Sequence, residues 1–156
     1  DGLSCNSRYH QRKVAVSKDW AYDCSSLGPV AQTNHTYWSI AMKNFPQQFK
    51  ELTTWMEKLG AEIPQAMQGF SALHESSMQS NALDTKTKEL IALGIAITVR
   101  CDGCIAFHVH DAMKAGASQA EIAETVSVAI LMGGGPSVVY GIEAMQALSQ
   151  YQEQGL

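Results

Sequence analysis

Apolar residues recur every three or four positions from Met42 to the end of the chain, and this is the period of an α-helix. Phe45 and Leu52 belong to the first such stripe, and breakers such as Pro64 and Gly116 divide the pattern into segments of helix length. No alternating strand pattern, hairpin signal or internal repeat interrupts it. The sequence therefore predicts an all-α fold, a compact bundle of about six helices.

Capping and breaking residues set the expected helix boundaries in the first half of this region. Gly60 is expected to end the first helix, and Pro64 suits the first turn of the second. Asp84 or Thr85 can cap a third helix that reaches about Val99. Because apolar residues cover this third segment almost continuously, we expect it to be the central helix, buried on several sides.

The second half of the region carries signals for three more helices. A fourth is expected from about Asp102 to Gly116, and the spacing of Ser118 and Glu121 is that of a capping box, which opens a fifth. Gly133-Gly134-Gly135-Pro136 then breaks the chain before a sixth. No strand precedes these glycines and no Lys-Ser/Thr pair follows them, so a tight turn between helices explains them better than a phosphate cradle.

The composition changes near residue 42 and divides the chain in two. Residues 1–41 are polar and lack a period, so they predict an irregular N-terminal arm. With 156 residues, of which 46% are hydrophobic, the chain can bury one core, and we expect one helical domain over residues 42–156. Cys5 and Cys24 lie in the arm, and their wide spacing leaves open whether they pair.

Charge and hydropathy exclude several classes of partner. The formal net charge is −4 and the eleven Lys and Arg residues are scattered, so no surface for a nucleic acid is expected. The longest apolar run, residues 90–99, is about half of the roughly 20 residues that cross a bilayer, so no membrane partner is expected. No targeting segment can be read in the chain, and we expect a cytoplasmic protein.

The segment Cys101-Asp102-Gly103-Cys104, followed by His108, carries the chemistry of the chain. Positions i, i+3 and i+7 share one face of a helix. Thiolates are favoured at a helix N-terminus, and a spacing of three residues permits a disulfide. An imidazole exchanges protons near neutral pH. We therefore expect a redox-active dithiol in the first turn of a core helix, with a base one turn further on.

The sequence leaves two questions about this site open: which cysteine is the more acidic, and whether Glu89 reaches the cysteines. Position at the helix start favours Cys101 as the more acidic thiol, whereas the neighbouring base favours Cys104. Glu89 would lie about 18 Å from Cys101 along a straight helix. A contact between them requires the chain to reverse near Arg100, or a second subunit to supply the carboxylate.

The same residues also have plainer interpretations. Cys101, Cys104 and His108 could be metal ligands, although no second Cys or His pair at zinc-finger spacing accompanies them. Glu89 could be an ordinary carboxylate near the start of its helix. His74 has no partner in the sequence, and we assign it to the surface.

These residues resemble the alkyl hydroperoxidase D-like branch of the carboxymuconolactone decarboxylase family over about residues 42–156. The resemblance implies an all-helical subunit in trimers or hexamers, with a cofactor-free thiol peroxidase or disulfide-exchange activity. By position it implies that Cys104 is the peroxidatic thiol, that Cys101 resolves it, and that Glu89 and His108 relay protons. The motifs that carry the resemblance are Leu83-Asp84, Glu89, Cys101-x-x-Cys104, His108 and Met132–Pro136.

Two departures from the family pattern refine the expected activity. The best-known alkyl hydroperoxidase has a histidine between its cysteines where this chain has Gly103, so that part of the relay is absent. The lactone decarboxylases of the family lack the cysteine pair, so lactone decarboxylation is not expected. The expected partners are a hydroperoxide substrate, an external dithiol or thiol protein as reductant, and further copies of the chain, with no cofactor and no metal. The alternatives are a general dithiol-disulfide oxidoreductase and a non-catalytic helical metal-binding or assembly module.

Overall fold

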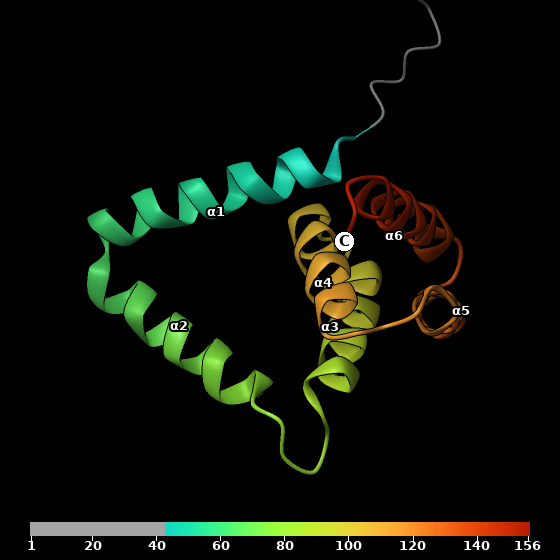
Figure 1. Ribbon diagram of the computed structural model, residues 1–156, viewed down its shortest axis with the longest axis horizontal. Helices are drawn as coiled ribbons and strands as arrows, with labels where there is room; N and C mark the ends of the chain where they lie inside the picture. The colour runs from blue at the N-terminus through green and yellow to red at the C-terminus, as the bar shows by residue number, and fades with distance from the viewer. Residues whose placement is uncertain (1–42) are drawn as a thin grey trace, which may run out of the picture. The chain divides into compact units, whose positions relative to one another are not determined.

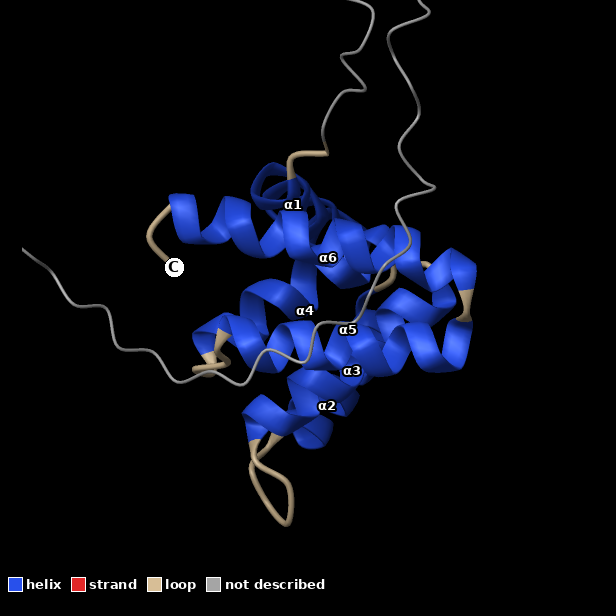
Figure 2. Cartoon of the chain, turned by 90° about the vertical axis from the view of Figure 1, so that its right-hand side faces the viewer, coloured by secondary structure: helices blue, strands red, loops and turns tan. Residues whose placement is uncertain are grey.

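A computed structural model of the chain describes residues 43–156, and Figure 2 shows only helices and connecting loops in this part. The all-α prediction is therefore confirmed for the described residues. The predicted arm, with Cys5 and Cys24, lies outside them. The six helices are α1 (Phe45–Glu62), α2 (Pro64–Met78), α3 (Thr85–Val99), α4 (Asp102–Lys114), α5 (Gln119–Gly133) and α6 (Gly135–Glu153).

The first helix is longer than its sequence predicts. Asn44 caps α1, since its side chain accepts the backbone N–H of Gln47 at 2.9 Å. The helix continues through Gly60, because one glycine costs only about 1 kcal/mol in a helix interior. It ends instead before Pro64, whose ring forces Ile63 out of the helical conformation, to φ −131° and ψ 61°. The expected end at Gly60 is therefore wrong by two residues.

A sharp reversal joins α3 to α4. Asp84 caps α3 by accepting the N–H of Thr87 at 2.7 Å. Of the two residues predicted as the cap, Asp84 is therefore the one that takes this position. The helix ends at Arg100, which takes the left-handed conformation (φ 62°) and is the only non-glycine residue with positive φ in the described chain. The N–H of Cys101 then bonds the carbonyl of Ala96 at 3.0 Å. This turn sends α4 back along α3.

The predicted capping box and glycine turn are both present around α5. Ser118 and Glu121 exchange hydrogen bonds at the start of the helix, so the box is complete. At the other end, a Cβ on Gly133 would lie 1.9 Å from the hydroxyl of Ser137, so no larger residue fits there. Gly134 has φ 64° and turns the chain directly into α6. The glycine run is therefore a turn between packed helices.

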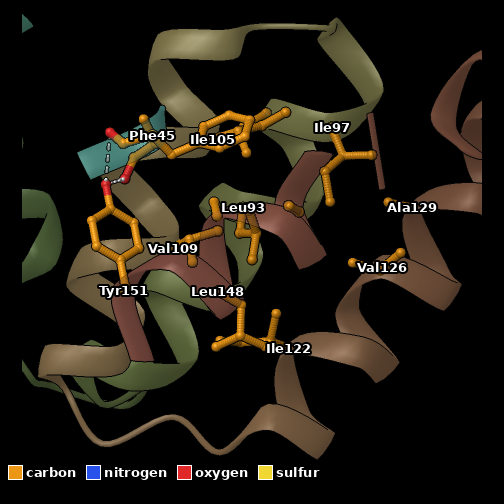
Figure 3. Close-up of a cluster of buried hydrophobic side chains, with 14 residues drawn as sticks. Phe45, Leu93, Ile97, Ile105, Val109, Ile122, Val126, Ala129, Leu148 and Tyr151 are labelled. Atoms are coloured by element: carbon orange, nitrogen blue, oxygen red, sulfur yellow. Dashed lines mark hydrogen bonds between the residues drawn. The ribbon is translucent and has the colours of Figure 1, made fainter. Parts of the chain in front are cut away.

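The core lies between α3, α4, α5 and α6, where Leu93, Ile105 and Ile122 are fully buried (Figure 3). The hydroxyl of Tyr151 lies in this core and donates a hydrogen bond to the carbonyl of Ala106 at 2.7 Å. Burial raises the pKa of this phenol above its usual value, because the anion would lose its hydration. The hydroxyl therefore stays a donor and ties α6 to α4.

The helices α1 and α2 extend away from this bundle, and α2 returns toward α3 (Figure 1). The start of α1 is fixed by Phe45, which is fully buried and lies close to Tyr151. No residue of α2 is buried. The two helices α1 and α2 therefore flank the bundle, and a pocket lies between them and α4.

The third helix is less covered than its composition suggests. Leu93 and Ile97 are buried, but Ile91, Ile95 and Val99 are each about half exposed or more. The expected burial on several sides is therefore wrong for the single chain, because no helix of the described part covers that face. Neither α3 nor any other helix in residues 43–156 is long and apolar enough to span a membrane.

Replacing Tyr151 by phenylalanine tests the hydrogen bond between α6 and α4. The change leaves the Ala106 carbonyl without this donor, and we expect the free energy of unfolding to fall by about 1–2 kcal/mol. Urea unfolding followed by circular dichroism measures the change. The matched control is Tyr140→Phe, a half-buried position on the same helix, for which we expect a change within about 0.5 kcal/mol. Equal effects of the two changes would contradict the assignment.

Candidate active site

The two cysteines of the motif lie at the start of α4 and are joined by a disulfide, with their Cα atoms 5.2 Å apart. Cys101 is the N-cap residue, just ahead of the first turn, and its Sγ accepts the backbone N–H of Cys104 at 3.3 Å. Cys104 itself lies within the first turn. The expected dithiol at the N-terminus of a core helix is therefore present, with one sulfur as cap and the other inside the helix.

The turn at Arg100 brings Glu89 and His108 together. Glu89 Oε2 lies 2.8 Å from His108 Nδ1, and both residues belong to the same chain. No second subunit is needed for this contact, because the chain reversal alone supplies it. Glu89 is only 3% exposed and is the one buried charged residue of the described chain. A buried carboxylate needs a partner, and the imidazole provides it.

The contact between Glu89 and His108 also determines which ring nitrogen of His108 faces away from the carboxylate. Glu89 engages Nδ1 of His108, so Nε2 is the ring nitrogen that can exchange a proton with a bound molecule. The His108 side chain is 18% exposed, which is enough to reach a ligand and little enough to be held in one orientation. A carboxylate that orients an imidazole is one arrangement that suits general acid-base catalysis.

A pocket of about 500 Å³ opens between α1, α2 and α4, and we call it the thiol pocket. Cys104 and His108 both line it, whereas Cys101 does not. Its other walls are mostly apolar, and its size suits a small organic molecule. The remaining lining residues are Leu52, Met56, Leu59, Met67, Phe70, Ser71, His74, Gly103 and Phe107.

His74 is a pocket residue that the sequence does not reveal. It is half-buried, its ring meets the ring of Phe107 edge-on with centroids 5.8 Å apart, and its Nε2 is buried. The surface assignment is therefore wrong. The return of α2 toward the bundle places His74 opposite α4, and no local pattern in the sequence predicts that return.

Gly103 sets how closely α1 approaches the dithiol. A Cβ at this position would lie 3.4 Å from Cδ2 of Leu52, which lines the thiol pocket from α1. A methyl group would just fit, and a larger side chain would displace Leu52. The glycine thus lets an apolar wall lie directly over the first turn of α4.

The sulfurs and the imidazole are not arranged as a set of metal ligands in this structure. The two sulfurs are bonded to each other, and His108 Nδ1 is turned toward Glu89. Within residues 43–156, no group of three or more His, Cys, Asp or Glu side chains is placed to hold a metal ion. The geometry instead combines a disulfide with an imidazole that a buried carboxylate orients.

The comparisons with known proteins identify the family. The sequence profile of the carboxymuconolactone decarboxylase family matches residues 64–147, more than half of the chain. The chain belongs to the carboxymuconolactone decarboxylase family. The matched range contains Glu89, Cys101, Cys104 and His108, so all four candidate site residues lie in the part that defines the family.

Solved structures agree with this family and with the fold. A carboxymuconolactone decarboxylase family protein from Legionella pneumophila is 42% identical, with a TM-score of 0.67, over 69% of this chain and 96% of that protein. A Thermotoga maritima family member, described with a suggested part in antioxidative response, is 28% identical with a TM-score of 0.64, over 69% and 92% of the two chains. A curated relative from Haemophilus influenzae, described as uncharacterized, is 41% identical over 105 residues, 65% of this chain and 93% of that protein.

Removing one partner of the buried Glu89–His108 pair tests how strongly it stabilises the site. His108→Ala leaves a buried carboxylate without its partner, and we expect the free energy of unfolding to fall by about 2–4 kcal/mol. Adding Glu89→Gln removes the stranded charge, so the double variant should be more stable than His108→Ala alone. Urea unfolding of the two single variants and the double variant measures this. Equal stability of His108→Ala and the double variant would show that the carboxylate is not held by the imidazole.

Proposed function

We propose that this chain is a cofactor-free thiol peroxidase that reduces hydroperoxides through a dithiol-disulfide cycle of Cys101 and Cys104. The observation that carries the proposal is the thiol pocket itself. One sulfur of a disulfide-forming pair lines a pocket together with an imidazole that a buried carboxylate orients. The part in antioxidative response that is suggested for the Thermotoga relative supports the same direction.

The proposed reaction balances with an external dithiol as reductant. The Cys104 thiolate attacks the terminal oxygen of the hydroperoxide, the O–O bond breaks, and the alcohol leaves with a proton from His108. Cys104 is then a sulfenic acid. The Cys101 thiol condenses with it, so that an S–S bond forms and water leaves. An external dithiol then reduces this disulfide by exchange and is itself oxidised to a disulfide.

The pocket favours Cys104 over Cys101 as the attacking thiol. Cys104 lines the thiol pocket next to His108, while Cys101 lies at the cap outside its lining. The cap position gives Cys101 the helix-terminal field, but a nucleophile must also reach its substrate. We therefore assign attack to Cys104 and resolution to Cys101, with Glu89 holding His108 as the proton carrier.

The substrate that this pocket favours is a hydroperoxide with an apolar body. Leu52, Met56 and Phe70 are among its walls, and these side chains offer an organic group an apolar environment that hydrogen peroxide cannot use. Cumene hydroperoxide is a suitable probe because its phenyl and methyl groups are apolar and its reactive end is small.

The proposal is tested by following the loss of cumene hydroperoxide in the presence of a dithiol reductant. We expect turnover by the wild-type chain and at least a hundredfold loss in Cys104→Ser, since serine cannot form a thiolate. Cys101→Ser should still react once and then stop as a sulfenic acid, which dimedone labelling and mass spectrometry detect.

The matched control for these variants is the pair of cysteines in the arm. Cys5→Ser with Cys24→Ser should leave the rate unchanged. An unchanged rate in Cys104→Ser would overturn the assigned nucleophile. A mixed disulfide that reacts much faster than any peroxide would instead identify a general dithiol-disulfide oxidoreductase.

We also propose that the chain forms a homo-oligomer through a second apolar region, the groove between α3 and α5. This α3–α5 groove encloses about 490 Å³, and Ile95, Val128 and Met132 at its walls are each more than half exposed. Further exposed apolar residues lie on α6, among them Val139 and Ile142. Exposed apolar surface of this extent marks an interface, and the family resemblance favours trimers or hexamers.

A charge in the α3–α5 groove should dissociate the oligomer without unfolding the subunit. Ile95→Asp places a carboxylate on an already exposed position, so the subunit loses little packing while the interface gains an unpaired charge. Light scattering after size-exclusion chromatography should show a lower mass, with unchanged helix content. Leu73→Asp, 63% exposed on α2 and outside the groove, is the matched control and should keep the wild-type mass. A wild-type monomer would contradict the proposal.

A further inference from the structure

Lys43 connects the start of α1 to the first turn of α4. Its Nζ lies 2.7 Å from Oδ2 of Asp102 and 2.7 Å from Oε1 of Glu143 on α6. Asp102 immediately follows Cys101 in the chain. One ammonium group thus pairs with the carboxylate that lies between the two cysteines in sequence and with a second carboxylate, so the three groups together keep one net negative charge instead of two.

The position of this ammonium group is fixed by the backbone next to it. The side-chain amide of Gln150 donates to the carbonyl of Lys43 at 2.8 Å, and its oxygen accepts the N–H of Phe45 at 2.8 Å. Phe45 is fully buried in the core. The backbone at Lys43 is therefore anchored to α6, which keeps its side chain within reach of Asp102 and Glu143.

Lys43 keeps its charge while thiols titrate. Partial burial by itself lowers the pKa of Lys43, but the hydrogen bonds to Asp102 and Glu143 outweigh it, and the net direction is upward. The amine therefore stays protonated at any pH at which a thiol ionises. The charge balance at the start of α4 is then constant during the reaction.

Glu143 is the second carboxylate that depends on the charge of Lys43. Its side chain is 15% exposed, and its Oε2 is buried and has no hydrogen-bond partner among residues 43–156. A carboxylate so placed depends on Lys43 at its other oxygen. Without the lysine, the carboxylates of Asp102 and Glu143 would lie together with no cation between them, and the one that follows Cys101 in the chain would oppose the formation of a thiolate nearby.

We infer that Lys43 is a positioning residue for the dithiol, which cancels the field of Asp102 and thereby keeps the cysteines of α4 acidic enough to react. The helix start alone favours thiolates, and Asp102 alone disfavours them. Lys43 decides the outcome in favour of the thiolate without touching either sulfur. The inference deepens the proposed function, since it explains how the peroxidatic thiol is ionised.

Within residues 43–156, further charged and titratable groups lie near the dithiol or near Lys43, on each element that packs there. The face of α1 that lines the thiol pocket contributes only apolar side chains. Lys43 is therefore the cation that contacts the carboxylate of the motif, and the remaining groups stay unchanged in the experiment below. They are Glu89 on α3, Arg100 in the α3–α4 turn, His74 on α2, His108 on α4, and Glu143 and Tyr140 on α6.

The test measures the rate of iodoacetamide alkylation of Cys101 and Cys104 in the reduced full-length chain against pH, by peptide mass spectrometry. We expect Lys43→Met to move the midpoint of the curve upward by about half a pH unit, the effect of one unit charge at roughly 10 Å when the effective dielectric constant is about 50, between the protein-surface and bulk-water values. Below the midpoint this is about a threefold slower alkylation, by the tenfold change per pH unit of a titrating thiolate. Raising the salt to 0.5 M should shrink the difference, since screening shortens the range of the field.

Two further variants separate charge from structure. Asp102→Asn should move the midpoint downward, and the double variant Lys43→Met/Asp102→Asn should return close to the wild-type curve, because the two charge changes cancel. Lys43→Arg keeps the charge and should keep the curve. A Lys43→Met curve that matches wild type would overturn the inference, as would an upward shift that Asp102→Asn does not reverse.

The readout is independent of the peroxidase assay. Alkylation needs no hydroperoxide, so curves that move as described in a chain that turns over no peroxide would sink the proposed function and keep the inference. Peroxide turnover with unmoved curves would do the opposite. Circular dichroism of each variant confirms that the helices are intact before the curves are compared.

Discussion

The site depends on one backbone event, the left-handed residue at Arg100 that ends α3 and starts α4. In this reversal the N–H of Cys101 donates a hydrogen bond to the carbonyl of Ala96 near the end of α3, and α4 then runs back along α3. As a result Glu89, in the second turn of α3, meets His108, in the middle of α4. A straight continuation would leave these two side chains far apart. Helix packing therefore brings the carboxylate to the imidazole, whereas the imidazole and the sulfurs are already neighbours along α4.

Around this reversal, each neighbouring helix contributes a different property. The α3 helix supplies the buried carboxylate, and α6 holds α4 through the hydroxyl of Tyr151. The α1–α2 pair builds an apolar wall over the first turn of α4, with Gly103 allowing Leu52 to lie close to it. The start of α1 adds a cation next to Asp102. The chemistry is thus concentrated on α4, while its orientation, environment and charge balance come from the other helices.

The sequence predicts the local features well and the long-range ones poorly. The cap at Asp84, the box at Ser118 and the helix-starting cysteine pair follow from short patterns, because caps and turns depend on neighbours within a few residues. His74 escapes prediction, since its place in the pocket depends on where α2 returns in space. The exposed face of α3 escapes as well, because apolar composition does not say whether a helix or another subunit covers a residue.

The sulfur of Cys101 has two tasks in one atom. It accepts the amide of Cys104 as the cap of α4, and it is also one half of the bond that oxidation makes and reduction breaks. The start of the helix and the oxidation state of the protein are therefore coupled, because a disulfide sulfur and a thiolate sulfur differ as hydrogen-bond acceptors for the N–H of Cys104. Hydrogen exchange at the first amides of α4 should then report how oxidised the chain is, without any reagent directed at sulfur.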